Sequence, residues 1–302
     1  MKAVLLHEYG GPDNLKYEEW DDPQAHDGQI LICVVAAGIN PIDWKLRSGA
    51  MKTFMPLELP VILGYDYSGV VRSVGKGVEG YTEGDKVFGR ASKTYAEFLL
   101  ADLAGLSKLP KGLDHIEAAA LPVVLNTGEQ LIVQAGKVKP GQTVVITGAL
   151  GSVGRTAAWV AKKLGAHVIA GVRGSQKKAA EELGADALLA LDSRQEMDSL
   201  GSVEVVADTI GGNVGDALIA KVKPGGTYAS VVGPPSNAQR YPAVKVEAFG
   251  SHPDAASMRS LAEDIANGKF KIPVDRTIPL SDAAKAHAEA EKGGIGKVLL
   301  LP

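Results

Sequence analysis

Apolar residues follow two different patterns along the chain, and the change between them divides the sequence. From residue 1 to about 118, short apolar or β-branched runs alternate with clusters of glycine, proline and acidic residues. Such runs predict β-strands joined by turns, and their succession predicts a small barrel-like or rolled sheet. The expected strands are 2–6, 29–37, 67–74 and 95–100.

Beyond this region, strand-like and helical patterns alternate. Helical periodicity occurs at 114–120 and 126–134, and the alternation then continues to about Val232. It predicts a doubly wound parallel sheet, so the fold class is α/β. The expected strands here are 187–191, 203–208 and 226–231, and the expected helices are 194–200 and 213–221. The tail is predicted to contain a strand at 243–249, a helix at 255–267, a helix at 281–292 capped by Ser281, and a strand at 297–301.

The stretch from 143 to 186 shows this alternation most clearly. A β-branched run at 143–147 is followed by Gly148, Gly151 and Gly154, a helical pattern at 155–164 and a second apolar run at 167–172. This order predicts a βαβ unit with parallel strands and a right-handed connection. Glycines at such a turn let the backbone come close to a ligand, and the N–H groups at the helix start favour a pyrophosphate. The spacing is GxxGxxG and not the common GxGxxG, so the alternative is an ordinary glycine-rich turn.

The residues after the second strand of this unit indicate which dinucleotide binds. The chain has Arg173 there, with Ser175, Lys177 and Lys178 behind it and no carboxylate before Glu181. An acidic residue would hold the ribose 2′-hydroxyl of NAD, whereas a guanidinium suits the 2′-phosphate of NADP. The expected cofactor is therefore NADPH, and the alternative is that Arg173 is only a solvated surface residue.

Composition narrows the function classes. The chain of 302 residues is 45% hydrophobic and 22% charged with a net charge of −3, which gives no electrostatic case for nucleic acid or an anionic membrane. The apolar run near the N-terminus is too short for a secretory signal and no stretch is long enough to span a bilayer, so a cytoplasmic protein is expected. The single cysteine, Cys33, excludes an internal disulfide and is expected to be a buried, inert thiol.

Several motifs together resemble a known family. They are the segments AAGINPIDWKLRSG (36–49), LGYDYSGVVRSVGKGVEGYTEGDKVFG (63–89), TYAEF (94–98), VKPGQTVVITGALGSVG (138–154) and GKVLL (296–300). In this order they resemble the medium-chain dehydrogenase/reductase superfamily, and within it the zinc-free NADPH:quinone oxidoreductase-like branch. The resemblance implies a GroES-like catalytic domain at 1–118, an inserted Rossmann domain at 119–243 and a segment at 244–302 that returns to the catalytic domain. It also implies an active site between the domains, and a homodimer.

The chain departs from the zinc-binding alcohol dehydrogenases at two positions. Asn40 stands where those members carry a cysteine, and Tyr65 stands where they carry a histidine. Their four-cysteine structural zinc lobe also has no counterpart between Gly89 and Thr94. Catalytic zinc needs about three protein ligands, so we expect a protein that works without zinc.

The resemblance makes Asn40 and Tyr65 the candidate catalytic residues. Asn40 is expected near the nicotinamide and the acceptor, with the alternative of a loop residue before Pro41 that holds local backbone bonds. Tyr65 is expected to donate a hydrogen bond to the acceptor or to line the site. Asp43 is expected to be structural, and Trp44 and Arg47 either border the substrate entrance or are a packed aromatic and a solvated arginine.

Further cofactor contacts are implied by the resemblance alone. Thr127 is expected near the nicotinamide, Asp208 and Ile210 on the adenosine side, Val232 and Gly233 after the fifth strand, and Gly296 and Lys297 over the nicotinamide. A lysine and a tyrosine that relatives use at the 2′-phosphate are replaced by Ser175 and Ser193. Arg173, supported by Lys177, is thus expected to carry the phosphate recognition. The expected cofactor-binding residues are Asn40, Thr127, Gly148, Ala149, Leu150, Gly151, Ser152, Val153, Gly154, Arg173, Ser175, Lys177, Asp208, Ile210, Val232, Gly233, Gly296 and Lys297.

These expectations combine into an NADPH-dependent, zinc-independent reductase of quinones or α,β-unsaturated carbonyls. Hydride transfer to such electron-poor acceptors needs orientation more than a Lewis acid. One alternative is an enoyl reductase that acts on a thioester or a specialised metabolite. The other is an NADPH-binding sensor or structural protein with little turnover, because fold does not fix function.

Overall fold

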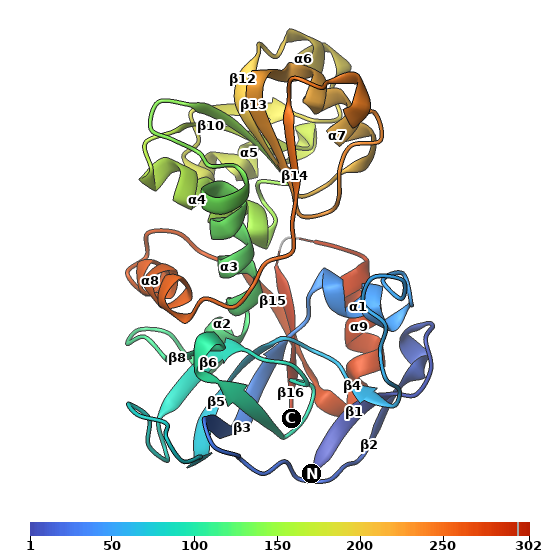
Figure 1. Cartoon of the computed structure of the whole chain (residues 1–302), viewed down its shortest axis with the longest axis vertical. Coiled ribbons are helices and arrows are strands. Elements are labelled where there is room, and N and C mark those ends of the chain that lie inside the picture. The colour runs from blue at the N-terminus through green and yellow to red at the C-terminus, as the bar shows by residue number, and fades with distance from the viewer. Residues whose placement is uncertain (295) are drawn as a thin grey trace. The chain divides into compact units, whose positions relative to one another are not determined.

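The computed structural model describes residues 1–294 and 296–302, which form two compact units (Figure 1). Unit 1 contains Met1–Val123 and Pro253–Pro302, and unit 2 contains Val124–His252. The expected fold class, a β-rich domain with an inserted parallel-sheet domain, is confirmed. The domain borders expected after residues 118 and 243 lie five and nine residues before the borders of these units, which follow Val123 and His252.

Unit 1 is built from two sheets. A small antiparallel sheet has the order β2-β1-β4, and a larger one has the order β15-β16-β3-β5-β6-β8 with β7 also paired to β3. The strands are β1 (Lys2–Leu6), β2 (Leu15–Glu19), β3 (Gln29–Gly38), β4 (Val61–Ile62), β5 (Asp66–Val74), β6 (Lys86–Arg90), β7 (Phe98–Asp102), β8 (Leu106–Lys108), β15 (Val274–Pro279) and β16 (Lys297–Leu301). The helices are α1 (Pro41–Arg47), α2 (His115–Ala119), α8 (Ala255–Ala266) and α9 (Ala283–Glu291). Because β16 pairs with β3, the C-terminal strand belongs to the same sheet as strands from the first part of the chain.

Unit 2 is a parallel sheet of order β11-β10-β9-β12-β13-β14 with helices in the connections. This order steps outward from β9 in both directions, so the sheet has a switch point beside β9, where open α/β sheets bind ligands. The strands are β9 (Thr143–Thr147), β10 (His167–Val172), β11 (Ala187–Ala190), β12 (Val203–Asp208), β13 (Val222–Ser230) and β14 (Lys245–Ala248). The helices are α4 (Ser152–Lys163), α5 (Lys177–Ala180), α6 (Arg194–Ser199) and α7 (Gly212–Leu218), and α3 (Pro122–Gln130) begins at the unit border.

Each unit has its own hydrophobic core. In unit 1 the fully buried side chains include Tyr67, Tyr95 and Phe88. In unit 2, Val145 and Val206 lie side by side on paired strands and are completely buried. Burial of such side chains on separate sheets supplies the main favourable free energy of each unit. None of the described helices combines the length and apolar sequence needed to cross a bilayer.

Several predicted elements have the observed bounds, and others differ for local reasons. The strands 2–6, 143–147, 167–172, 203–208 and 297–301 are confirmed. The strand expected at 95–100 is instead β7, because Tyr95 is hydrogen-bonded to Leu63 and Ala96 bridges Ala3. The helix α1 was not predicted, although a proline at its first position suits a helix start. Ser281 is not the cap of α9, since it lies in a short 3₁₀ turn and Asp282 occupies the cap position.

Cys33 is less buried than expected. It lies on β3 as a free thiol and is only partly buried.

The close pairing of β3 and β5 gives a test of packing in unit 1. A Cβ atom added at Gly69 would lie 2.2 Å from the carbonyl oxygen of Cys33, which is backbone and cannot move aside alone. We expect Gly69→Ala to lower the free energy of unfolding by about 1–3 kcal/mol, the usual cost of overpacking. Urea denaturation would measure it. Gly11→Ala is the control, because nothing lies within 4 Å of a Cβ atom there, and equal effects of both changes would contradict the prediction.

Candidate functional site

The glycine turn after β9 has the geometry of a phosphate-binding loop. Gly148 has a φ of +60°, and α4 starts at Ser152 directly after Gly151 at the cap position. A Cβ atom at Gly154 would lie 2.2 Å from the carbonyl oxygen of Gly148, so only glycine allows the helix to sit this close to the turn. The strands β9 and β10 are parallel, as predicted for the βαβ unit. The first-turn N–H groups of α4 thus face a tight glycine backbone, the arrangement that accommodates a pyrophosphate.

A buried carboxylate fixes the loop on the neighbouring strand. Asp208, the last residue of β12, is 0% exposed and accepts hydrogen bonds from Thr147 Oγ1 at 2.7 Å and from the backbone of Ile210 and Gly211 at 3.1 and 3.0 Å. Ser230 Oγ donates to the other carboxylate oxygen at 3.0 Å. The position of Asp208 on the adenosine side stays a prediction. Its carboxylate shapes the loop beside the glycine turn.

The same edge of the sheet exposes apolar side chains. Ile210 is 48% exposed and Val232 is 40% exposed. A Cβ atom at Gly148 would lie 3.3 Å from Ile210 Cγ1, so Ile210 lies directly beside the turn. Gly233 has a φ of +113° and open space around it. These expected positions share one edge of unit 2 and offer apolar surface next to the phosphate-binding turn.

The cations after β10 differ in their surroundings. Arg173 and Ser175 are exposed. Lys177 Nζ contacts both carboxylate oxygens of Glu196, at 2.7 and 2.6 Å. The contact of Lys177 with the 2′-phosphate stays a prediction, and it would compete with this ion pair. The N–H of Gly174 donates to Asp192 Oδ1 at 2.7 Å.

Asp192 is a residue that the sequence analysis missed. It follows β11, which pairs in parallel with β10, so the two strands end side by side. The residues directly after 167–172 contain no carboxylate before Glu181, so Asp192 is not apparent from that stretch. Asp192 directly follows the strand predicted at 187–191. Because neighbouring parallel strands present their carboxyl ends at one edge of a sheet, this position could have indicated Asp192.

Thr127 lies within unit 2 but its hydroxyl has a protein partner. Its Oγ1 is 2.7 Å from Ser251 Oγ, and the residue is 8% exposed. A Cβ atom at the next residue, Gly128, would lie 2.5 Å from Thr156 Cβ, so α3 packs closely on α4. The role expected of Thr127 beside the nicotinamide stays a prediction.

In unit 1 the first candidate catalytic residue lies inside a buried polar network. Asn40 is 1% exposed, and its Nδ2 donates to Asp66 Oδ2 at 2.7 Å. Lys297 Nζ donates to Asn40 Oδ1 at 2.6 Å and to the carbonyl of Ile39 at 2.9 Å, and lies 3.5 Å from Asp66 Oδ2. Both ends of the Asn40 amide are therefore bonded to charged groups. Asn40 also holds local bonds at the start of α1, as the alternative expected, since its N–H donates to Asp43 Oδ2 and its carbonyl accepts from the N–H of Asp43.

Lys297 is likewise a buried residue. It is 6% exposed, and burial lowers the pKa of its ammonium while Asp66 opposes this. Burial likewise raises the pKa of Asp66, against the effects of Lys297 and of the hydrogen bond from Asn40. The side chain of Lys297 thus makes a structural contact inside unit 1, and the expected approach of this segment to the nicotinamide stays a prediction. Gly296 before it has a φ of +141°, and a Cβ atom added there would lie 3.0 Å from Asp275 Cβ, so glycine suits the turn into β16.

Asp43 completes this network and is structural, as expected. One carboxylate oxygen accepts from the backbone N–H of Asn40 and from the hydroxyl of Tyr95, both at 2.7 Å. Among the described residues, the other oxygen is buried without a hydrogen-bond partner. Burial raises the pKa of Asp43 to about 7, although both hydrogen bonds act against this.

Arg47 and Trp44 are packed inside unit 1. Arg47 is 3% exposed; it donates to the carbonyl of Gly10 at 3.1 Å, lies 3.1 Å from His287 Nδ1 and pairs with Glu291. It is therefore neither a solvated arginine nor exposed at an entrance. Instead it joins α1 to α9. Trp44 packs against the core of the unit.

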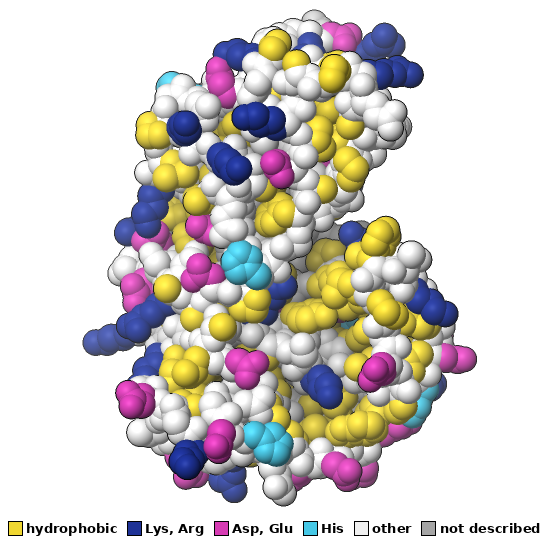
Figure 2. Space-filling view, in the orientation of Figure 1, with side chains coloured by type: hydrophobic (Ala, Val, Ile, Leu, Met, Phe, Trp, Pro, Cys, Tyr) yellow, Lys and Arg dark blue, Asp and Glu magenta, His cyan; other side chains and the backbone are white. Residues whose placement is uncertain are grey.

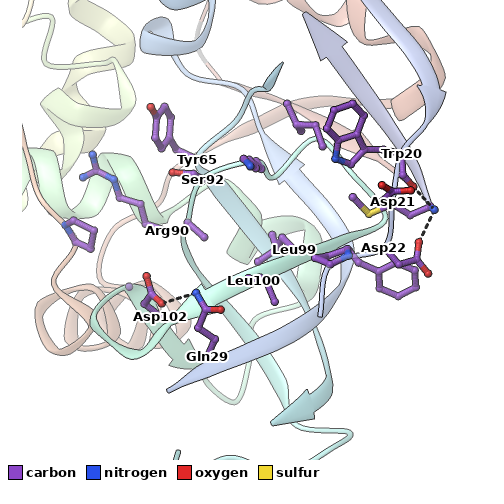
Figure 3. Close-up of a pocket in the computed structure, with 18 of the residues that line it drawn as sticks. Trp20, Asp21, Asp22, Gln29, Tyr65, Arg90, Ser92, Leu99, Leu100 and Asp102 are labelled. Atoms are coloured by element: carbon purple, nitrogen blue, oxygen red, sulfur yellow. Dashed lines mark hydrogen bonds and ion pairs between the residues drawn. The ribbon is translucent and has the colours of Figure 1, made fainter. Parts of the chain in front are cut away.

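Tyr65 lines a pocket of about 680 Å³ within unit 1 (Figure 3). Figure 3 shows Tyr65, Ser92 and Arg90 along one side of the pocket, with Trp20, Asp21 and Asp22 on the opposite side. Burial raises the pKa of the Tyr65 phenol, so its hydroxyl keeps its proton and is a donor at neutral pH. Figure 2 shows apolar side chains gathered around a hollow on this face of unit 1. The described residues contain no group of three or more histidine, cysteine, aspartate or glutamate side chains placed to hold a metal ion.

The raised pKa of Asp43 predicts a pH dependence of stability. Between its unfolded value near 3.8 and its folded value of about 7, the folded protein holds a proton that the unfolded chain has released. The free energy of unfolding therefore falls as the pH rises through this window. We expect Asp43→Asn to reduce the difference between pH 5 and pH 8 by about 1–3 kcal/mol, measured by urea denaturation. The exposed Asp27→Asn is the control, and an unchanged pH difference in Asp43→Asn would contradict the assignment.

Comparison with known proteins places these features in a family. Residues 26–111 match the alcohol dehydrogenase GroES-like domain, and residues 183–300 match a domain described as zinc-binding dehydrogenase. The chain is 32% identical to the NADPH-dependent alkenal/one oxidoreductase, chloroplastic, of Arabidopsis thaliana, over 100% of this chain and 80% of the relative. The quinone oxidoreductase of Coxiella burnetii has a similar structure, with a TM-score of 0.89, 30% identity and coverage of 100% and 99% of the two chains.

A further similar structure was solved with a bound cofactor. The quinone oxidoreductase of Escherichia coli complexed with NADPH superposes with a TM-score of 0.87 at 26% identity, over 100% of both chains. The resemblance inferred from the motifs is confirmed by the GroES-like match and by these full-length relatives. The chain belongs to the medium-chain dehydrogenase/reductase superfamily, and within it to the quinone oxidoreductase-like branch.

Proposed function

We propose that this protein is an NADPH-dependent reductase of quinones or α,β-unsaturated carbonyls that works without zinc. The observation that carries the proposal is the glycine turn after β9, where a Cβ atom added at Gly154 would lie 2.2 Å from the carbonyl oxygen of Gly148. This cradle fits a dinucleotide pyrophosphate, and Ile210, Val232 and Arg173 stand at the same edge of the sheet. The relatives named as an NADPH-dependent alkenal/one oxidoreductase and as quinone oxidoreductases support the cofactor and the acceptor class.

NADPH, when bound, supplies a hydride for an electron-poor double bond or quinone ring. The protein then has to hold the acceptor, exclude water and stabilise the oxygen on which charge develops. Tyr65 has the right chemistry for the last task, because its protonated hydroxyl is only partly buried and lines a pocket. For Asn40, the contacts with Asp66 and Lys297 support a positioning role, in which it holds the Gly38–Pro41 corner of unit 1 in one conformation.

The residues at the position that carries a zinc ligand in the zinc-binding alcohol dehydrogenases support a reaction without metal. Asn40 stands in place of the cysteine, and the ammonium of Lys297 lies 2.6 Å from its Oδ1. A positive charge at this distance repels a second cation. The acceptors proposed here need no Lewis acid, since the carbonyl or quinone already withdraws electrons from the reacting carbon.

A screen of NADPH oxidation tests the function. We expect turnover with quinones or simple enones, unchanged activity after treatment with EDTA, and less than stoichiometric zinc by elemental analysis. Turnover only with enoyl thioesters would favour the thioester reductase. Tight NADPH binding with no turnover on any class would favour a sensor or structural protein. Stoichiometric zinc would contradict the metal-free mechanism.

Cofactor preference depends on two opposite charges at the loop after β10. We expect Arg173→Ala to raise the Kd for NADPH about 10-fold and to leave that for NADH nearly unchanged, because a charge-assisted bond to the 2′-phosphate is lost. Asp192→Asn is expected to lower the Kd for NADPH several-fold, since it removes a carboxylate that repels phosphate beside Gly174. Fluorescence titration measures both constants. Lys178→Ala is the control, and an Arg173→Ala variant that keeps its preference would contradict the assignment.

The cellular location, the oligomeric state and the absence of nucleic-acid or membrane partners remain predictions. A cytoplasmic homodimer without nucleic-acid or membrane partners is consistent with the net charge of −3 and with the family resemblance. Light scattering coupled to size-exclusion chromatography determines the oligomeric state.

A further inference from the structure

The pocket of unit 1 has a cationic side that the proposed hydride transfer does not itself require. Arg90 ends β6, and Lys93 follows three residues later; both line the pocket with Tyr65 and Ser92. Lys93 also lines a neighbouring cavity of about 370 Å³ beside Trp20 and Ile62. Two cations and two hydroxyl donors thus border one partly apolar pocket. This is the donor set that recognises an oxyanion.

The loop that carries these residues is held in an unusual conformation. Ala91 N–H donates to the carbonyl of Tyr65 at 3.0 Å, and Tyr95 N–H donates to the carbonyl of Leu63 at 3.1 Å. Between these anchors, Lys93 has a φ of +66°, the left-handed region that a side chain other than glycine rarely adopts. Strained backbone that its surroundings hold in place is frequent at ligand-binding positions. The anchors fix Lys93 at the border of the two cavities.

The rest of the lining defines the ligand's size and charge. Leu99 and Leu100 of β7 lie between the cationic side and the side formed by Trp20, Asp21 and Asp22 (Figure 3). This surface suits a short apolar or planar body. Asp21, Asp22 and Asp102 also line the pocket, and they would repel a ligand with several negative charges. Asp22 is compensated by the terminal ammonium at 2.5 Å, and Asp102 accepts from Gln29 at 3.4 Å.

We propose that this pocket selects acceptors that carry one carboxylate next to a short unsaturated body, with Arg90 and Lys93 as the residues that recognise the carboxylate. The inference rests on the proposed function, because it names the acceptor class of that reaction. For a 4-oxo-2-enoate, the carbon–carbon double bond gains one hydride and one proton from water. The product is the saturated 4-oxo acid and the cofactor leaves oxidised, so two electrons are transferred in all.

The test compares two acceptors that differ only in charge. The rate constant kcat/KM with NADPH is measured for 4-oxopent-2-enoate and for its methyl ester, which has the same enone and no carboxylate. We expect the wild-type protein to prefer the acid. Arg90→Gln should lower the ratio of acid to ester about 10- to 100-fold, and Lys93→Gln about 3-fold because Lys93 is more exposed. Arg72→Gln is the control, since Arg72 is an exposed cation outside the pocket lining.

The outcomes separate the inference from the proposed function. Turnover of the ester with a ratio that neither pocket variant changes would overturn the inference and leave the reductase in place. Turnover of neither acceptor would count against the proposed reductase. In that case calorimetry with the saturated acid 4-oxopentanoate tests whether the pocket binds a carboxylate. Binding that is lost in Lys93→Glu supports carboxylate recognition, and no binding to the wild-type protein overturns it. Lys93→Glu also serves if Arg90→Gln fails to fold, because Lys93 is an exposed loop residue.

Discussion

The buried ammonium of Lys297 is the contact on which the architecture of unit 1 depends. It reaches the carbonyl of Ile39, the amide of Asn40 and the carboxylate of Asp66, which lie 231 to 258 residues away in the sequence. Burying charges costs free energy unless hydrogen bonds satisfy them, and here each group has at least one partner. Loss of one member would leave its partners as buried unpaired charges, which typically costs about 3–5 kcal/mol. This network therefore holds the last strand, the corner before α1 and the start of β5 in one arrangement.

The network also supports the proposal that the protein works without zinc, because Asn40 stands at the position where zinc-binding relatives carry a cysteine. The amide of Asn40 is oriented by the carboxylate of Asp66 and the ammonium of Lys297, so its direction is fixed by protein groups and needs no metal ion. Asp66 stands opposite Arg90 in the pairing of β5 with β6. Burial lowers the pKa of Arg90 while Asp66 and Tyr65 favour its charged form, so the pocket that Tyr65 lines is electrostatically linked to the network behind it.

Unit 2 depends on a different constraint, which is steric. The approach of Gly154 to Gly148 leaves no room for a side chain, and the buried carboxylate of Asp208 holds the next loop in place. Together they shape an edge with the glycine turn at the start of α4, the exposed apolar side chains of Ile210 and Val232, and the exposed guanidinium of Arg173. A phosphorylated planar cofactor matches this combination better than a small polar metabolite, because it uses both the amides and the apolar surface.

The sequence by itself determined the features that arise from local patterns. The parallel βαβ unit, the glycine turn, the strands at 203–208 and 297–301 and the α/β fold class follow from periodicity and turn chemistry over a few residues, and the separate motifs identified the family. Only the tertiary structure decided where the polar side chains point. The ammonium of Lys297 lies beside Asp66, and Arg47 forms an ion pair with Glu291. Lys177 forms an ion pair with Glu196, and Asp192 accepts a hydrogen bond from the N–H of Gly174. Each of these contacts joins residues brought together by strand order or helix packing, and pairing over such sequence distances leaves no periodic trace along the chain.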